Sequence, residues 1–162
     1  MIGGFGTMET RTKQGWVSIV EISTISHATE DLGRVVEAVK NIIPKDLWGE
    51  FERVYSMDSL EGHYGNPITR IVARFKGKSA ERIAGYILSR LEKGDFETMI
   101  YTLDRRFDGK GRVFIRISKQ DAYLGRIRIM DGDDIIRVVL TLPGARSIDF
   151  VERVFRSLRG EV

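Results

Sequence analysis

Residues 112–129 read RVFIRISKQDAYLGRIRI, and this stretch has a clear period of two. Its alternating apolar positions are Val113, Ile115, Ile117, Ile127 and Ile129. The positions between them carry Arg112, Phe114, Arg116, Arg126 and Arg128. A period of two places successive side chains on opposite faces of a sheet. The stretch therefore predicts two strands, each with an apolar face and a cationic face.

An earlier segment, residues 68–76, repeats this pattern. Its apolar side consists of Ile71, Ala73 and Phe75, and its cationic side consists of Arg70, Arg74 and Lys76. Strands that are apolar on one side only are typical of antiparallel sheets that bury one face. We therefore expect an antiparallel sheet with one buried face and one open, arginine-rich face.

The remaining patterns predict an α+β domain. Strands are expected at residues 16–26, 51–60, 68–76, 112–118, 126–129 and 135–142, with helices at 29–43, 79–93, 95–103 and 147–159 and a helical turn at 119–125. Thr29 and Ser79 are the expected N-caps, and Gly94 is an expected C-cap. Single apolar stripes on the helices predict a two-layer sandwich with the helices on one face of a mostly antiparallel sheet.

Length and composition favour one soluble domain. The chain has 162 residues, 42% of them hydrophobic and 30% charged, with a net charge of +3. Residues 1–15 are glycine-rich and polar, so we expect a flexible leader followed by one domain over residues 16–162. No apolar run reaches the ~18 residues of a membrane span. The absence of cysteine excludes disulfides and thiol nucleophiles and fits a cytoplasmic location.

Catalytic motifs are weak. Residues 75–79 read FKGKS and resemble the end of a phosphate-binding loop, but the position of the first glycine is Val72. The two histidines, His27 and His63, have no partner at metal-ligand spacing. We therefore expect no catalytic residues, no metal and no cofactor, and interpret the chain as non-enzymatic.

A nucleic-acid interface has better support. The strand arginines at 70, 74, 112, 116, 126 and 128 can each hold a phosphate through paired hydrogen bonds. Phe114 can stack on a base or ribose, and Lys119, Gln120 and Tyr123 adjoin it in the following turn. Three other interpretations stay open: the cationic face is solvated and salt-bridged, Phe114 covers a dimer seam, or Phe114 lies under the N-terminal leader.

The loop at residues 62–67, GHYGNP, has two interpretations of equal weight. It is a glycine turn whose Tyr64 packs down, or it is a polar recognition surface beside Arg70. In the second case His63, Tyr64 and Asn66 would contact RNA.

Three motifs resemble those of an archaeal family of predicted RNA-binding proteins, described as a predicted exosome subunit. They are LEGHYGNPI at 60–68, ISHATED at 25–31 and KQDAYLG at 119–125. The resemblance runs from about Trp16 to the C-terminus. It implies a fold like that of the ribosomal protein that binds 5S rRNA, and an archaeal cytoplasmic source.

The leading hypothesis is RNA binding through the arginine-rich face by a monomer or homodimer. Exosome or ribosome-associated proteins are the further partners that the resemblance implies. The alternative is a protein-interaction or dimerisation module that uses the same face without nucleic acid. A third hypothesis is an RNA-modifying enzyme that uses His63.

Overall fold

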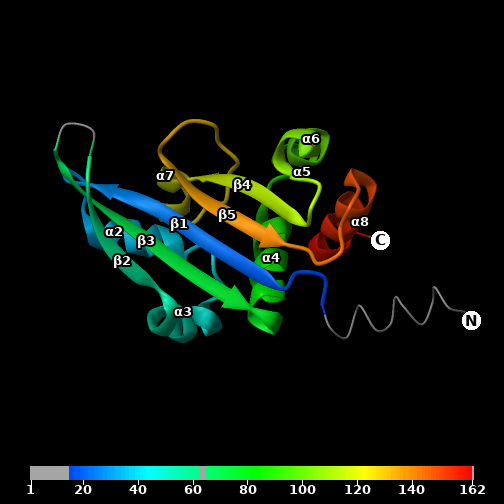
Figure 1. Cartoon of the computed structure of the whole chain (residues 1–162), viewed down its shortest axis with the longest axis horizontal. Coiled ribbons are helices and arrows are strands. Elements are labelled where there is room, and N and C mark those ends of the chain that lie inside the picture. The colour runs from blue at the N-terminus through cyan, green and yellow to red at the C-terminus, as the bar shows by residue number, and fades with distance from the viewer. Residues whose placement is uncertain (1–14, 63–64, 162) are drawn as a thin grey trace, which may run out of the picture.

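The computed structural model describes residues 15–62 and 65–161, and it forms one antiparallel sheet with helices (Figure 1). The strands are β1 (Ile19–His27), β2 (Ser56–Glu61), β3 (Pro67–Lys76), β4 (Arg112–Ser118) and β5 (Ile135–Thr141). They lie in the order β2-β3-β1-β5-β4, and every neighbouring pair is antiparallel. The predicted α+β class with an antiparallel sheet is confirmed.

Seven α-helices occur in the described residues. They are α2 (Leu32–Lys40), α3 (Trp48–Val54), α4 (Gly77–Arg90), α5 (Lys93–Tyr101), α6 (Leu103–Arg106), α7 (Lys119–Tyr123) and α8 (Ile148–Arg159), and a short 3-10 helix (Lys45–Leu47) precedes α3. Helices α2 and α4 lie behind the sheet in Figure 1, which therefore shows the face that these helices leave uncovered. None of the helices in the described ranges is long and apolar enough to cross a membrane.

The core lies between the sheet and these helices. Alternate strand residues such as Val20, Ile22 and Phe75 are buried against apolar residues of α4, including Ile83 and Ile87. Burying a side chain of this size stabilises the fold by roughly 1.5–3 kcal/mol. The same alternation sends the intervening residues of each strand to the uncovered face.

The predicted strand at 51–60 is wrong in its first half. Residues 48–54 form α3, and only residues 56–61 pair with β3. Phe51 and Tyr55 are four residues apart, and their rings stack with centroids 4.7 Å apart. A spacing of four brings side chains together on a helix but not on a strand, so this pair indicates the helix.

The predicted strand at 126–129 is also wrong. Only Ile129 forms a β-bridge, opposite Ile117. The Ser118 N–H donates to the Arg128 carbonyl at 2.9 Å, and the Met130 N–H donates to the Arg116 carbonyl at 3.1 Å. The segment is therefore a loop that occupies the outer edge of β4, which would otherwise present unpaired backbone groups.

Three predicted helix ends are corrected. Asp31, not Thr29, caps α2, because its Oδ1 accepts the Arg34 N–H at 3.2 Å. Ser79 lies inside α4 and donates its hydroxyl to Glu50 at 2.6 Å. Gly94 lies inside α5, and α4 ends with Leu91 as its C-cap.

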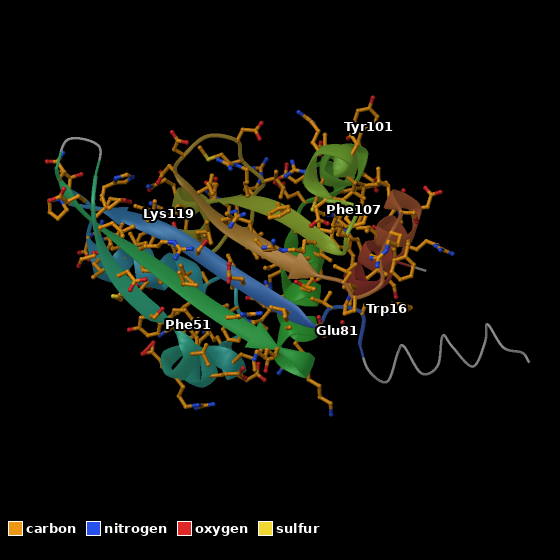
Figure 2. The ribbon with its side chains drawn as sticks, in the orientation of Figure 1. Trp16, Phe51, Glu81, Tyr101, Phe107 and Lys119 are labelled. Carbon is orange, nitrogen blue, oxygen red and sulfur yellow. The ribbon has the colours of Figure 1, made fainter. Side chains whose placement is uncertain are left out.

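Glu81 of α4 fixes the start of the described chain. Its Oε1 accepts the backbone N–H groups of Trp16 at 2.7 Å and Val17 at 2.8 Å, and Figure 2 shows Glu81 beside Trp16. The expected leader falls on residues 1–15, of which 1–14 lie outside the described ranges.

Candidate nucleic-acid interface

The face of the sheet opposite α2 and α4, hereafter the open face, carries cations from three strands. Strand register places Arg74 and Arg70 beside Glu21 and Ile25 of β1, and it places Arg112 and Arg116 beside Thr141 and Arg137 of β5. The cations of the open face are Arg70, Arg74 and Lys76 of β3, Arg112 and Arg116 of β4, and Arg137 of β5.

Carboxylates on the open face are fewer. Asp58 of β2 is the cross-strand neighbour of Arg70, and Glu21 of β1 is that of Arg74. Neither makes an ion pair with these arginines. Within residues 15–62 and 65–161, no ion pair is formed by Arg70, Arg74, Arg112, Arg116 or Arg137. Arg116 donates a hydrogen bond to the Gly132 carbonyl. Arg70 and Arg74 form no side-chain hydrogen bond within the described ranges, so their guanidinium groups remain available to an external anion.

Phe114 and Arg137, on the neighbouring strands β4 and β5, form a small cluster near the β4 edge of this face. The guanidinium carbons of Arg112 and Arg137 lie 5.2 Å and 5.1 Å from the centroid of the Phe114 ring. Sequence reasoning placed Phe114 here but missed Arg137. The signal was present, because Arg137 lies within the predicted strand at 135–142, where its position puts it opposite Arg116. A base stacking here would meet guanidinium planes as well as the ring.

A cavity of about 520 Å³ lies beside this cluster. Side chains from α5, α6, β4, β5 and the loop after α7 line it: Asp95, Thr98, Thr102, Arg105, Arg106, Phe114, Arg116, Ile129, Met130, Asp131 and Arg137. We call it the α6 cavity. The chain bends at Thr102, between α5 and α6, and α6 supplies two adjacent arginines to the wall.

Arg105 and Arg106 were missed by sequence reasoning, because the predicted helix at 95–103 ended before them, whereas the structure places both in α6. In the structure Arg106 is half-buried, and its Nε donates to the Thr102 hydroxyl at 2.9 Å. Burial lowers the pKa of Arg106; Asp131 opposes this effect, while Arg105 and Arg116 lower the pKa further. Arginine remains charged at neutral pH, so the cavity gathers positive charge.

Arg126 and Arg128 lie in the loop beside β4 and are paired with carboxylates. Arg128 Nε lies 2.9 Å from Asp95 and 3.1 Å from Glu92. The hydrogen bond that Arg128 donates to Asp95 raises the pKa of Arg128. Arg126 lies 3.2 Å from Asp121. These two arginines hold the 126–130 loop, and we leave them out of the proposed RNA contacts.

Lys119, Gln120 and Tyr123 also point to internal partners. The side chain of Lys119 is 4% exposed, and its Nζ lies 3.1 Å from carboxylates of both Glu30 and Asp134. Gln120 donates to Asp134 at 3.0 Å. Tyr123 is half-buried, with the Arg34 guanidinium 5.7 Å from its ring centroid. Lys119 and Gln120 therefore share Asp134 as a partner, while Tyr123 contacts Arg34 of α2.

The loop at 62–67 is described only in part. Asn66 is exposed, and its carbonyl accepts the Gly62 N–H at 2.6 Å, so the loop closes tightly. A Cβ atom at Gly62 would lie 2.9 Å from that carbonyl oxygen, which explains the glycine. His63 and Tyr64 lie outside the described residues. Within the ranges 15–62 and 65–161, no group of three or more carboxylate or histidine side chains is arranged to hold a metal ion.

Comparisons with known proteins identify relatives of this chain. A family described as RNA binding matches residues 19–142. Uncharacterized protein MJ0213 of Methanocaldococcus jannaschii is 36% identical over 124 residues, which cover 74% of this chain and 80% of that protein. RNA-binding protein PAB1135 of Pyrococcus abyssi is 32% identical over 123 residues, covering 74% and 77% respectively. The crystal structure of protein AF2318 from Archaeglobus fulgidus superposes with a TM-score of 0.74 at 30% identity, covering 85% of this chain and 99% of that one.

Proposed function

The chain belongs to the family described as RNA binding, and from this premise we propose that it is a non-enzymatic RNA-binding protein that holds the phosphate backbone on the open face. The observation that carries the proposal is the row of arginines from β3 across β5 to β4 that form no ion pairs in the described structure. Guanidinium groups bind phosphate oxygens through paired, charge-assisted hydrogen bonds.

The position of the row supports contact with several phosphates at once. Arg74 and Arg70 lie on β3, Arg137 lies on β5, and Arg116 lies beside it on β4. Neighbouring strands are about 4.8 Å apart, so β3 and β4, with β1 and β5 between them, are separated by roughly 14 Å. A single phosphate cannot span this distance. The row therefore fits a stretch of backbone rather than an isolated anion.

The proposal is tested by RNA affinity in a pair of double variants. Arg70→Ala with Arg74→Ala removes two cations of the open face. Arg53→Ala with Lys78→Ala removes two exposed cations of α3 and α4 and serves as the control for net charge. We expect the first variant to bind a single-stranded oligoribonucleotide at least tenfold more weakly than the control, since charge-assisted hydrogen bonds contribute about 1.5–3 kcal/mol each. Equal affinities would contradict the proposal.

A second candidate is a protein contact on the same face. Ile25 of β1 and Leu60 of β2 are 38% and 42% exposed, and both lie near Arg70 on the open face. Exposed apolar residues that lie close together favour a protein partner or a second copy. In that case Leu60→Lys would lower the apparent mass in sedimentation equilibrium, and RNA affinity would not change.

We also propose a role as an accessory to RNA processing or degradation in the cytoplasm, including association with an exosome. The three motifs that resemble the predicted exosome subunit family support this proposal. Co-purification of exosome proteins with the tagged chain, retained after ribonuclease treatment, is the expected result. Loss of the association after ribonuclease treatment would mean that the chain and the exosome proteins are joined only through RNA that both bind.

A further inference from the structure

We infer that the α6 cavity receives a single unpaired nucleotide of the RNA, with its phosphate among the arginines and its base against the apolar wall. This inference rests on the proposed function and adds to it a preference for RNA with an unpaired position. The cavity lies at the β4 end of the arginine row, so a strand held on the open face leads into it.

The lining has two chemically different walls. Arg105, Arg106, Arg116 and Arg137 form the cationic wall, while Phe114, Ile129 and Met130 form the apolar wall. A nucleotide combines an anionic phosphate with a flat base in the same way. Proteins read unpaired RNA by splaying a base out and stacking it on aromatic rings or guanidinium planes.

The balance of charge in the cavity also favours an anion. Four arginines face two carboxylates, Asp95 and Asp131. Asp95 is already engaged by the Arg128 guanidinium and the Ile129 N–H, at 2.9 Å and 3.0 Å. Asp131 is exposed and acts on Arg106 only through its charge. The arginines therefore repel one another more than the carboxylates compensate, and a phosphate would relieve this repulsion.

The volume restricts what can enter. About 520 Å³ lies within the range of pockets that enclose one compound of nucleotide size. A paired helix is far larger than such a pocket. Duplex RNA would therefore meet only the open face, whereas a bulged or terminal nucleotide can use both surfaces.

The test compares two duplex RNAs of the same sequence, one blunt and one with a single bulged nucleotide. Wild type should bind the bulged RNA roughly tenfold more tightly than the blunt RNA, because the unpaired base can stack in the cavity. Arg105→Ala with Arg106→Ala should reduce the ratio of the affinity for bulged RNA to the affinity for blunt RNA to near one. The control Arg53→Ala with Lys78→Ala, which leaves the cavity lining unchanged, should keep it.

Two single variants make the test independent of any loss of folding. Arg105 is exposed and its side chain forms no hydrogen bond or ion pair in the described structure, so Arg105→Ala should fold normally and lower the ratio of the two affinities. Asp131→Asn should raise the ratio of the two affinities, because the substitution removes the negative charge that opposes a phosphate. An unchanged ratio in both variants would overturn the inference.

The failures of the two proposals are distinguishable. Equal binding of blunt and bulged RNA by wild type, with both weakened by Arg70→Ala and Arg74→Ala, would overturn the cavity and leave RNA binding by the open face intact. Binding of neither RNA by folded wild-type protein would overturn both. A 2-aminopurine base at the bulge gives a second readout, because its fluorescence should change on binding wild type and much less on binding the α6 double variant.

Discussion

Lys119 is a charged residue in the interior of the protein. Its Nζ donates to the Ile25 carbonyl at 2.7 Å and lies 3.1 Å from both Glu30 and Asp134. Burial raises the pKa of Asp134, but hydrogen bonds from Gln120 and Lys119 outweigh this effect and hold the pKa below its ordinary value. One amino group thus joins β1, the segment before α2 and the turn before β5.

Lys119→Met should lower the free energy of unfolding by about 2 kcal/mol. Removing one partner of a buried ion pair costs about 3–5 kcal/mol, and the cost is smaller here because both carboxylates are partly exposed to water. Urea unfolding measures the change, with Lys78→Met as the surface control. RNA affinity of the folded variant should stay within about twofold of wild type. Weakened RNA binding without loss of stability would mean that Lys119 contacts RNA.

Sequence reasoning could place the strand arginines but could not assign their partners. Arg70 and Arg128 have the same alternating surroundings in sequence, yet Arg70 forms no ion pair in the described structure while Arg128 pairs with Asp95, 33 residues away. Local pattern determines the face of a strand on which a side chain lies. It contains no information on which acid the fold brings close to that side chain, and this depends on tertiary contacts.

At the scale of elements, the turn into β4 depends on Gly111, whose backbone lies against Leu142, the residue that follows β5. Gly111 has φ +100°, and its carbonyl accepts the Leu142 N–H at 2.6 Å. A Cβ atom at this position would lie 2.8 Å from the Leu142 carbonyl oxygen. The turn and the approach of the backbone both require glycine. Since β4 carries Arg112, Phe114 and Arg116, this turn also positions part of the proposed site.

Gly111→Ala should lower the free energy of unfolding by at least about 2 kcal/mol, from a strained positive φ together with the clash. Gly109→Ala is the matched control, because Gly109 also has a positive φ, +78°, but has open space at its Cβ position. Gly109→Ala should lower the free energy of unfolding by about 1 kcal/mol. Equal losses in thermal or urea unfolding would show that the contact with Leu142 has no energetic role.

The elements themselves were predictable where their periodicity was regular. The strands at 68–76, 112–118 and 135–142 were found because each is rich in apolar and β-branched residues at alternate positions, and each is confirmed within one residue at either end. The 126–129 segment alternates too, but the Arg126 N–H donates to the Asp121 carbonyl and the Ile129 N–H to the Asp95 carboxylate. These bonds bend the segment into a loop. Neither could be inferred from a pattern four residues long.

At the scale of the whole molecule, several carboxylates spread over the surface are stabilised in their charged form. Asp46, Glu97, Asp108, Asp121 and Asp134 all have pKa values below their ordinary range. Hydrogen bonds from Arg82 and Arg156 have the largest effect on the pKa values of Asp46 and Glu97. Backbone N–H groups have the largest effect on the pKa of Asp108. A carboxylate whose pKa falls on folding stabilises the native state above its unfolded pKa, and this stabilisation is lost as pH falls through the folded value.

The free energy of unfolding should therefore change little between about pH 7 and pH 5 and fall steadily below about pH 4. Urea unfolding at about pH 7, 5 and 3 measures this dependence. Asp108→Asn should reduce the loss between pH 5 and pH 3, because the amide cannot titrate while its oxygen can still accept the Lys110 and Arg112 N–H groups. A free energy of unfolding that rises below about pH 4 would contradict the lowered pKa values of these carboxylates.

The net charge of the chain is only +3, so RNA binding depends on where the cations lie rather than on their total number. Each phosphate neutralised by an arginine releases counterions, and the logarithm of affinity falls with the logarithm of salt by ~0.7 per phosphate for a single strand. This slope counts the contacts directly. It separates a row of arginines from an apolar partner surface, which responds little to salt.

The most direct measurement is this salt slope, obtained by fluorescence anisotropy of a labelled single-stranded RNA between about 50 and 200 mM salt. The account predicts a steep slope for wild type that becomes shallower by about 1.4 in the Arg70→Ala, Arg74→Ala variant, because two phosphate contacts are lost. The Arg53→Ala, Lys78→Ala control should keep the slope of wild type. If wild type and both folded variants share one slope, the open face does not hold the RNA backbone.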